Sequence, residues 1–131
     1  MSHHPAEGQK AFKMVLVDTS VWVAHLRTGD IGLEAQLNNG LVVCHPFIIG
    51  ELACGTLKNR AEILSLLHEL TMAVQIDHEE ILSFIDKHRL MGKGLGYIDI
   101  HLLASAMLTQ TALWTLDKRL DSVSSMIGIK Y

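Results

Sequence analysis

Cysteine, long apolar runs and an excess of positive charge are all scarce in this chain, and each shortage excludes a class of protein. The 131 residues include two cysteines, Cys44 and Cys54, which form no CxxC pair. A chain of this size with an aliphatic core needs no disulfide, so we expect both thiols to be small core side chains in a cytoplasmic protein. The formal charge of −3 argues against a basic protein that coats duplex nucleic acid.

Membrane and export signals are also missing. No apolar stretch reaches the roughly 18 residues of a membrane span, and the first residues lack the charged segment and apolar core of a signal peptide. Residues 1–13 are polar and patternless, so we interpret them as a disordered leader or a remnant of cloning. The chain is 49% hydrophobic and 19% charged, and we expect residues 14–131 to form one compact domain.

Short apolar runs alternate with longer amphipathic segments from Met14 onward, a pattern typical of an α/β domain with a parallel sheet. The predicted strands are residues 14–18, 41–44, 72–76 and 112–116, with a weak edge strand at 127–129. The predicted helices follow residue 18, span 33–37, start at Pro46, span 61–70, 77–88 and 97–108, and follow residue 117. The segment 97–108 is apolar on nearly every side, which predicts central burial.

Four carboxylates interrupt or close strongly apolar runs, where ionised side chains are costly unless something compensates them. Asp18 and Asp117 end predicted strands, whereas Glu51 and Asp99 lie in the first turns of predicted helices. The carboxyl ends of parallel strands and the amino ends of helices collect along one edge of an α/β sheet. Two carboxylates about 4 Å apart would repel by roughly 4 kcal/mol at an effective dielectric near 20, and a hard divalent cation compensates that repulsion.

Oxygen ligands of this kind favour Mg²⁺ or Mn²⁺, ions that keep bound water and bind phosphate groups. The predicted chemistry is metal-assisted in-line hydrolysis of a phosphodiester. We expect Asp18 and Asp99 to be direct ligands and Glu51 to be a ligand or to orient metal-bound water. The outer members of the predicted site are Asp117, as a second-site or outer-shell acid, and the hydroxyls of Thr115 and Ser20, which would hydrogen-bond water or carboxylate.

These acids lie in four short motifs that occur in a fixed order. The motifs are VDTSVW at 17–22, IGEL at 49–52, the segment 92–105 that ends in GYIDIHLLAS, and LWTLDK at 113–118. Together they resemble the PIN-domain family and, within it, the VapC-type toxins of bacterial and archaeal toxin–antitoxin pairs. The resemblance extends from residue 14 to about residue 129.

The resemblance implies a three-layer α/β/α domain with a central, mainly parallel sheet of four to five strands. It also implies a Mg²⁺- or Mn²⁺-dependent endoribonuclease that selects its RNA by sequence or structure, is usually homodimeric and is inhibited by a VapB-like antitoxin. The family's acids fall on Asp18, Glu51, Asp99 and Asp117, and its small hydroxyl residue falls on Thr115. Many relatives carry a further acid where this chain has Arg119. Asp121 is an alternative acid for that role, and a second metal, if bound, is expected to be weak.

Basic residues near the expected edge could bind an RNA backbone, although charged, solvated surfaces produce the same pattern. The candidates are Arg89, Lys93, Lys118 and Arg119. The glycines of segment 92–96 favour a flexible helix entry over a nucleotide-binding loop, because the segment lacks the GxxxxGK[ST] form. Tyr97, beside that segment, remains a candidate for stacking on a base, and His101 is expected to be a buried histidine.

Each acid also has a simpler interpretation. Asp18 and Asp117 could cap the helices that follow them, Asp99 could complement a helix dipole, and Glu51 could face solvent. The functional interpretation depends on all four acids matching one ordered pattern. Two other classes stay open: a receiver-like signalling domain, for which Asp77 is the available phosphoacceptor, and a PIN-like module that binds partners without turnover.

Overall fold

A four-stranded parallel sheet forms the centre of the protein, in the strand order β3-β2-β1-β4. The computed structural model describes residues 12–29 and 32–131. The strands are β1 (Val15–Val17), β2 (Val42–Cys44), β3 (Thr71–Met72) and β4 (Ala112–Trp114). Every side chain of β1 and β2 is buried, as expected for a parallel sheet covered on both faces. The predicted α/β class and the parallel sheet are confirmed.

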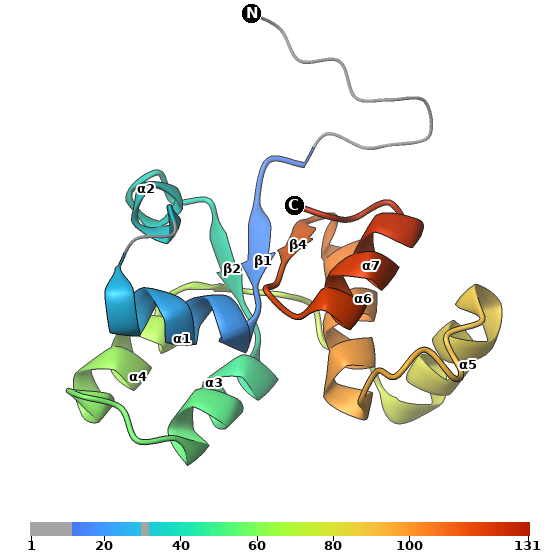
Figure 1. The fold of residues 1–131 in the computed structure, drawn as a ribbon, viewed down its shortest axis with the longest axis horizontal. Coiled ribbons are helices and arrows are strands. Elements are labelled where there is room, and N and C mark those ends of the chain that lie inside the picture. The colour runs from blue at the N-terminus through green and yellow to red at the C-terminus, as the bar shows by residue number, and fades with distance from the viewer. Residues whose placement is uncertain (1–11, 30–31) are drawn as a thin grey trace, which may run out of the picture.

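Helices cover both faces of this sheet and complete a three-layer α/β/α domain, as predicted. The helices are α1 (Thr19–Thr28), α2 (Leu33–Asn38), α3 (Pro46–Cys54), α4 (Arg60–His68), α5 (His78–His88), α6 (Tyr97–Thr109) and α7 (Lys118–Met126). Figure 1 shows α1 to α4 on one side of the strands and α5 to α7 on the other. The predicted central helix is α6, which is buried continuously from Ile100 to Ala106.

Strand register brings the carboxyl ends of the strands to one edge. β1 pairs with β2 through Val15 and Val42, and with β4 through Val15 and Ala112. The residues that follow these three strands therefore lie level with one another: Asp18 after β1, His45 after β2 and Thr115 after β4. We call this the carboxyl edge; β1 points downward toward it in Figure 1.

All four predicted strands are shorter in the structure: β1 and β2 span Val15–Val17 and Val42–Cys44, where residues 14–18 and 41–44 were predicted. β3 ends at Met72 instead of continuing to residue 76, because the Val74 N–H donates to the Thr109 hydroxyl (2.9 Å) and so leaves the sheet. The predicted strand 112–116 ends at Trp114, and Leu116 is exposed.

The predicted edge strand at 127–129 is wrong. α7 continues to Met126, and the chain then meets β4 only as an isolated bridge between Leu113 and Lys130. One cysteine prediction is also wrong, because Cys54 is exposed at the end of α3, whereas Cys44 is buried as predicted.

The start of the chain lies mostly outside the described residues. The predicted leader spans 1–13, of which the structure describes Phe12 and Lys13, and Phe12 packs against the hydrophobic core. Within the described part of the chain, no helix is both long and apolar enough to span a bilayer.

Candidate active site at the carboxyl edge

Asp18 lies at the centre of the carboxyl edge and is held there by two hydroxyl groups. Its carboxylate is buried, and oxygen Oδ2 accepts hydrogen bonds from Thr115 Oγ1 (2.7 Å) and Ser20 Oγ (2.8 Å). Asp18 occupies the N-cap position of α1, but its side chain makes no capping hydrogen bond. The simpler interpretation of Asp18 as a helix cap is therefore wrong.

The same hydroxyls fix the turn between β4 and α7. Ser20 Oγ accepts from the Leu116 N–H (2.9 Å), and Thr115 Oγ1 accepts from the Asp117 N–H (3.0 Å). Each hydroxyl thus donates to Asp18 and accepts from a backbone N–H of the turn after β4; Ser20 is 96 residues from its partner Leu116, whereas Thr115 belongs to the turn itself. The predicted hydrogen-bonding role of Ser20 and Thr115 toward a carboxylate is present in the structure.

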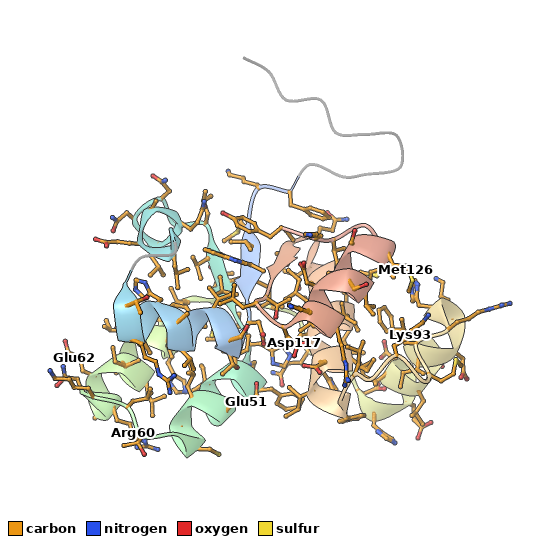
Figure 2. The ribbon with its side chains drawn as sticks, in the orientation of Figure 1. Glu51, Arg60, Glu62, Lys93, Asp117 and Met126 are labelled. Carbon is orange, nitrogen blue, oxygen red and sulfur yellow. The ribbon has the colours of Figure 1, made fainter. Side chains whose placement is uncertain are left out.

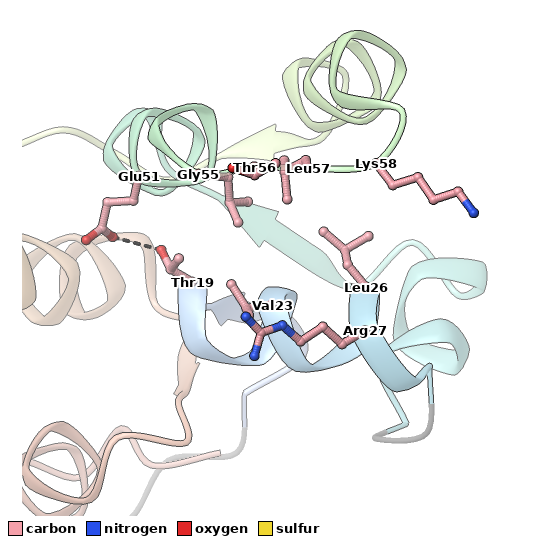
Figure 3. Close-up of a pocket in the computed structure, with 10 residues that line it drawn as sticks. Thr19, Val23, Leu26, Arg27, Glu51, Gly55, Thr56, Leu57 and Lys58 are labelled. Atoms are coloured by element: carbon pink, nitrogen blue, oxygen red, sulfur yellow. Dashed lines mark hydrogen bonds between the residues drawn. The ribbon is translucent and has the colours of Figure 1, made fainter.

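Glu51 joins this edge from α3 through a partner that the sequence did not indicate. Its Oε1 accepts from the hydroxyl of Thr19 at 2.7 Å, the first residue of α1 (Figure 3). Both hydroxyls at the start of α1, those of Thr19 and Ser20, therefore donate to carboxylates. Only the structure identifies Thr19 as part of the site, because its partner is 32 residues away.

Asp99 and Asp117 approach from the other side of the sheet. Asp99 Oδ2 accepts from the Gly96 N–H at the start of α6 (3.1 Å), and Asp117 Oδ1 caps α7 by accepting from the Leu120 N–H (2.9 Å). Burial raises the pKa of Asp99; the Gly96 hydrogen bond lowers this pKa, and the charges of Asp18 and Asp117 raise it further. The carboxylates at the ends of β1 and β4 and at the start of α6 therefore interact electrostatically. Figure 2 shows Glu51 and Asp117 near the middle of the molecule, below the ends of the strands.

All four carboxylates share one arrangement: a single oxygen of each is engaged by the protein. The engaged oxygens are Oδ2 of Asp18, Oε1 of Glu51, Oδ2 of Asp99 and Oδ1 of Asp117. The second oxygen of each has no hydrogen-bond donor or cationic partner among residues 12–29 and 32–131. Capping and structural hydrogen bonds thus orient the acids while leaving one oxygen of each available.

The four motifs that carry these acids fall within a match to the family model described as PIN domain, which spans residues 15–125. The chain belongs to the PIN-domain family. Two strains of Mycobacterium tuberculosis, CDC 1551 / Oshkosh and ATCC 25618 / H37Rv, each have a relative named Ribonuclease VapC32. It is 44% identical to this chain over 117 residues, which is 88% of this chain and 94% of the relative. The chain is a PIN-domain protein of the VapC type.

A solved structure shares the fold of this PIN domain. The crystal structure of PAE2754 from Pyrobaculum aerophilum superposes with a TM-score of 0.57 at 17% sequence identity, covering 90% of this chain and 83% of that one. Family membership shows that the receiver-like alternative is wrong. Asp77, its proposed phosphoacceptor, is the N-cap of α5 and accepts from the Glu80 N–H at 2.8 Å.

The donor atoms of this PIN domain fit a hard divalent cation, since they are carboxylate oxygens oriented by hydroxyl and amide groups. Within the described ranges, no three Asp, Glu, His or Cys side chains are arranged as a set that could hold a metal ion. Mg²⁺ requires fewer protein ligands, because it retains several waters and is usually bound by one or two carboxylates. Asp18 and Asp99 have the donor chemistry and the mutual electrostatic interaction for this role.

Arg119, which stands where many PIN domains carry an acid, packs over the glycine loop before α6. A Cβ placed on Gly94 would lie 3.0 Å from Arg119 Cδ and Nη1, and Gly94 has a φ of +76°. Glycine suits this position, because the left-handed backbone strains other residues and because a Cβ would crowd the Arg119 side chain. The loop that carries Lys93 is thereby joined to the start of α7, which carries Lys118. Asp121, the alternative acid, pairs through Oδ2 with Lys130 Nζ at 3.1 Å.

Histidine and aromatic side chains pack against one another where α3 and α6 begin. His101 is buried, as predicted, and its ring packs against Phe47 and Tyr97. His45 caps α3 by accepting from the Phe47 N–H (3.0 Å), and burial together with the nearby His101 lowers the pKa of His45 to about 4. Tyr97 is half exposed beside Asp99 and is oriented by a 2.7 Å hydrogen bond to His78. Burial lowers the pKa of both His45 and His101, so these two packed side chains are neutral near pH 7.

Proposed function

We propose that this PIN domain is a Mg²⁺- or Mn²⁺-dependent endoribonuclease that hydrolyses RNA phosphodiester bonds. The observation that carries the proposal is the set of four oriented carboxylates, each with one oxygen free of protein partners. The names of the Mycobacterium tuberculosis relatives, which are ribonucleases, support the same chemistry. Among residues 12–29 and 32–131, no histidine or cysteine is hydrogen-bonded to these carboxylates in the way that nucleophilic catalysis would require.

A bound cation supplies Lewis acidity to the phosphate and lowers the pKa of an attacking water. In this proposal Asp18 and Asp99 hold the cation through their free oxygens, while Ser20 and Thr115 keep the Asp18 carboxylate in one orientation. Glu51, fixed by Thr19, accepts a hydrogen bond from the attacking water through Oε2. Asp117 acts from the outer shell, because α7 uses its other oxygen as a cap.

The proposal predicts that the Asp18→Asn variant loses RNA cleavage in Mg²⁺ or Mn²⁺ by at least about a hundredfold, since a neutral amide holds a divalent cation poorly. The measurement is the cleavage rate of total and single-stranded RNA by protein purified free of other nucleases. Asp86→Asn is the matched control, because Asp86 is an exposed acid near the end of α5 and is not one of the four carboxylates. Equal cleavage by wild type and Asp18→Asn would refute the proposal in favour of a PIN-like module without turnover.

We also propose that a VapB-like antitoxin inhibits the enzyme, as the relatives' VapC name suggests. A cavity of about 490 Å³ opens between α1, α2 and α4, and its lining is mostly leucine and isoleucine. Trp22 and His25 line this cavity, and within the described ranges the Trp22 indole N–H and His25 Nδ1 have no hydrogen-bond partner. An apolar segment that presents a carbonyl or hydroxyl group would complement this surface.

The remaining expectations concern assembly and location. We propose that the protein is a homodimer and acts in the cytoplasm, where RNA is available and thiols such as those of Cys44 and Cys54 stay reduced. Sedimentation of the purified chain, alone and with its antitoxin, tests the assembly. A monomer at the concentrations that cut RNA would contradict the dimer without affecting the nuclease.

A further inference from the structure

A groove of about 300 Å³ runs from the carboxyl edge between α1 and the end of α3 (Figure 3). One end is formed by Glu51 and Thr19, the hydrogen-bonded pair of the proposed active site. The apolar side chains that line it are Val23, Leu26, Leu52 and Leu57. The groove therefore joins one of the four carboxylates to an apolar surface outside the acid cluster.

Two cations border the same groove. Arg27 and Lys58 both line it and both are exposed. Neither forms a salt bridge with a carboxylate within residues 12–29 and 32–131. Figure 3 shows the Arg27 guanidinium turned back along α1 toward the Thr19 end, whereas Lys58 extends outward at the far end. Glu51 is the one carboxylate among the lining residues that the structure describes, and it lies at the active-site end.

We propose that this groove binds the unpaired nucleotide next to the cleaved phosphodiester, with its base on the apolar surface and its phosphate on Arg27. The inference rests on the proposed nuclease function and names the part of the substrate that α1 and α3 would hold. An RNA strand that is cut internally extends beyond the cleaved bond in both directions. On the α1 side, the groove is the surface that adjoins the proposed active site. Its volume is at the lower end of the usual range for ligand pockets, about 300 Å³.

The charge and shape of the groove favour RNA over a protein partner. A nucleotide combines an anionic phosphate with a flat apolar base, and the groove combines a guanidinium with aliphatic side chains. A base inside a duplex is stacked and paired and does not present its faces, so the occupant is single-stranded or looped RNA. The cavity between α1, α2 and α4 offers the contrast, because no lysine or arginine occurs among its described lining residues.

The test separates binding from cleavage by using a fluorescent, mixed-sequence RNA oligonucleotide with 2′-O-methyl riboses, measured by anisotropy in EDTA at several salt concentrations. We expect Arg27→Ala to raise Kd about tenfold, because a charge-assisted hydrogen bond to phosphate is lost. The slope of log K against log salt should fall by about 0.7, the value for one phosphate contact on a single strand. Thr56→Trp, which narrows the groove at an exposed position, should raise Kd without changing that slope.

The matched control is Lys13→Ala, an exposed cation before β1 and so at the opposite end of the sheet, for which Kd and slope should match wild type. If wild type cuts RNA while Arg27→Ala and Thr56→Trp bind the oligonucleotide as wild type does, the groove inference is overturned and the nuclease function stands. If these variants lose antitoxin binding and keep RNA binding, the groove is a protein interface and the inference is also overturned. If wild type cuts no RNA under any condition, the proposed function itself fails.

Discussion

At the scale of single residues, the hydroxyls of Ser20 and Thr115 determine how the Asp18 carboxylate is presented. Both donate to Oδ2, so the carboxylate plane is fixed and Oδ1 is the oxygen left without a protein donor among the described residues. A buried carboxylate that is oriented in this way loses little further rotational freedom when a ligand binds, because its rotation is already restricted.

The hydroxyl network predicts that Thr115→Val destabilises the fold by about 1–3 kcal/mol, since the change preserves shape while removing a buried hydroxyl that donates to the buried Asp18 carboxylate and accepts from the Asp117 N–H. Urea denaturation measures this loss in the free energy of unfolding. Thr28→Val is the control: the Thr28 hydroxyl is exposed and bonds only the Ala24 carbonyl of its own helix, so a change within about 0.5 kcal/mol is expected. Equal effects of the two substitutions would argue against a structural role for the Thr115 hydroxyl.

The sequence predicted the acids better than it predicted their partners. Asp18 and Asp117 were recognisable because each closes an apolar run, which is a local property. The bond between Thr19 and Glu51 depends on how α1 packs on α3, and no local pattern encodes that packing. For the same reason the sequence could not distinguish Asp117, which does cap its helix, from Asp18, which does not.

At the scale of elements, two glycines near the acids differ in whether their backbone conformation favours glycine. Gly50 lies inside α3 at an exposed position, and a Cβ there would meet no atom within 4 Å. Gly94 has a positive φ and lies under Arg119 in the loop before α6. The first is an ordinary helix position occupied by a poor helix former, whereas the second is a position that favours glycine.

We therefore expect Gly50→Ala to raise the free energy of unfolding by about 0.5–1 kcal/mol and Gly94→Ala to lower it by about 1–2 kcal/mol. Thermal and urea unfolding of the two variants, compared with wild type, measure the changes. Gly94→Ala should also weaken oligonucleotide binding, because a Cβ 3.0 Å from the Arg119 side chain displaces that guanidinium. A Gly94→Ala protein as stable as wild type would show that the loop adopts another conformation.

Helices that begin at a strong capping signal were predicted to within a few residues. Asp77 begins α5 and Pro46 occupies the first turn of α3, as their positions in sequence indicated. Strand lengths were less predictable, since a strand continues only while its N–H groups find partners in the sheet. The Val74 N–H finds the Thr109 hydroxyl on α6 instead, a tertiary contact across 35 residues.

At the scale of the whole molecule, the fold concentrates negative charge where three separate elements meet. The raised pKa of Asp99 means that its ionisation is less favourable in the folded chain than in the unfolded one. The contribution of Asp99 to stability is therefore most favourable below its ordinary pKa of 3.8 and is lost as the pH rises through its higher folded pKa. A bound cation would reverse this penalty at neutral pH.

This linkage predicts that, in EDTA at neutral pH, Asp99→Asn unfolds at a higher temperature than wild type. The advantage should disappear below pH 3.8, where Asp99 is protonated in both states. Adding Mn²⁺ at 100 times its dissociation constant should stabilise wild type by about 2.7 kcal/mol and leave Asp99→Asn nearly unchanged. Calorimetry at several pH values measures both effects. An equal response of the two proteins to Mn²⁺ would place the cation elsewhere.

The hydrogen bonds that join Asp18 and Ser20 to Thr115 and Leu116 connect positions 96 or 97 residues apart. Ribosomes release a chain from its amino end, at about 5–20 residues per second. Asp18 and Glu51 thus emerge long before β4 and the turn that supports them. Until β4 and the start of α7 have been synthesised, the nascent polypeptide lacks a complete set of acids, so whatever chemistry this edge performs can begin only after residue 117 has been translated.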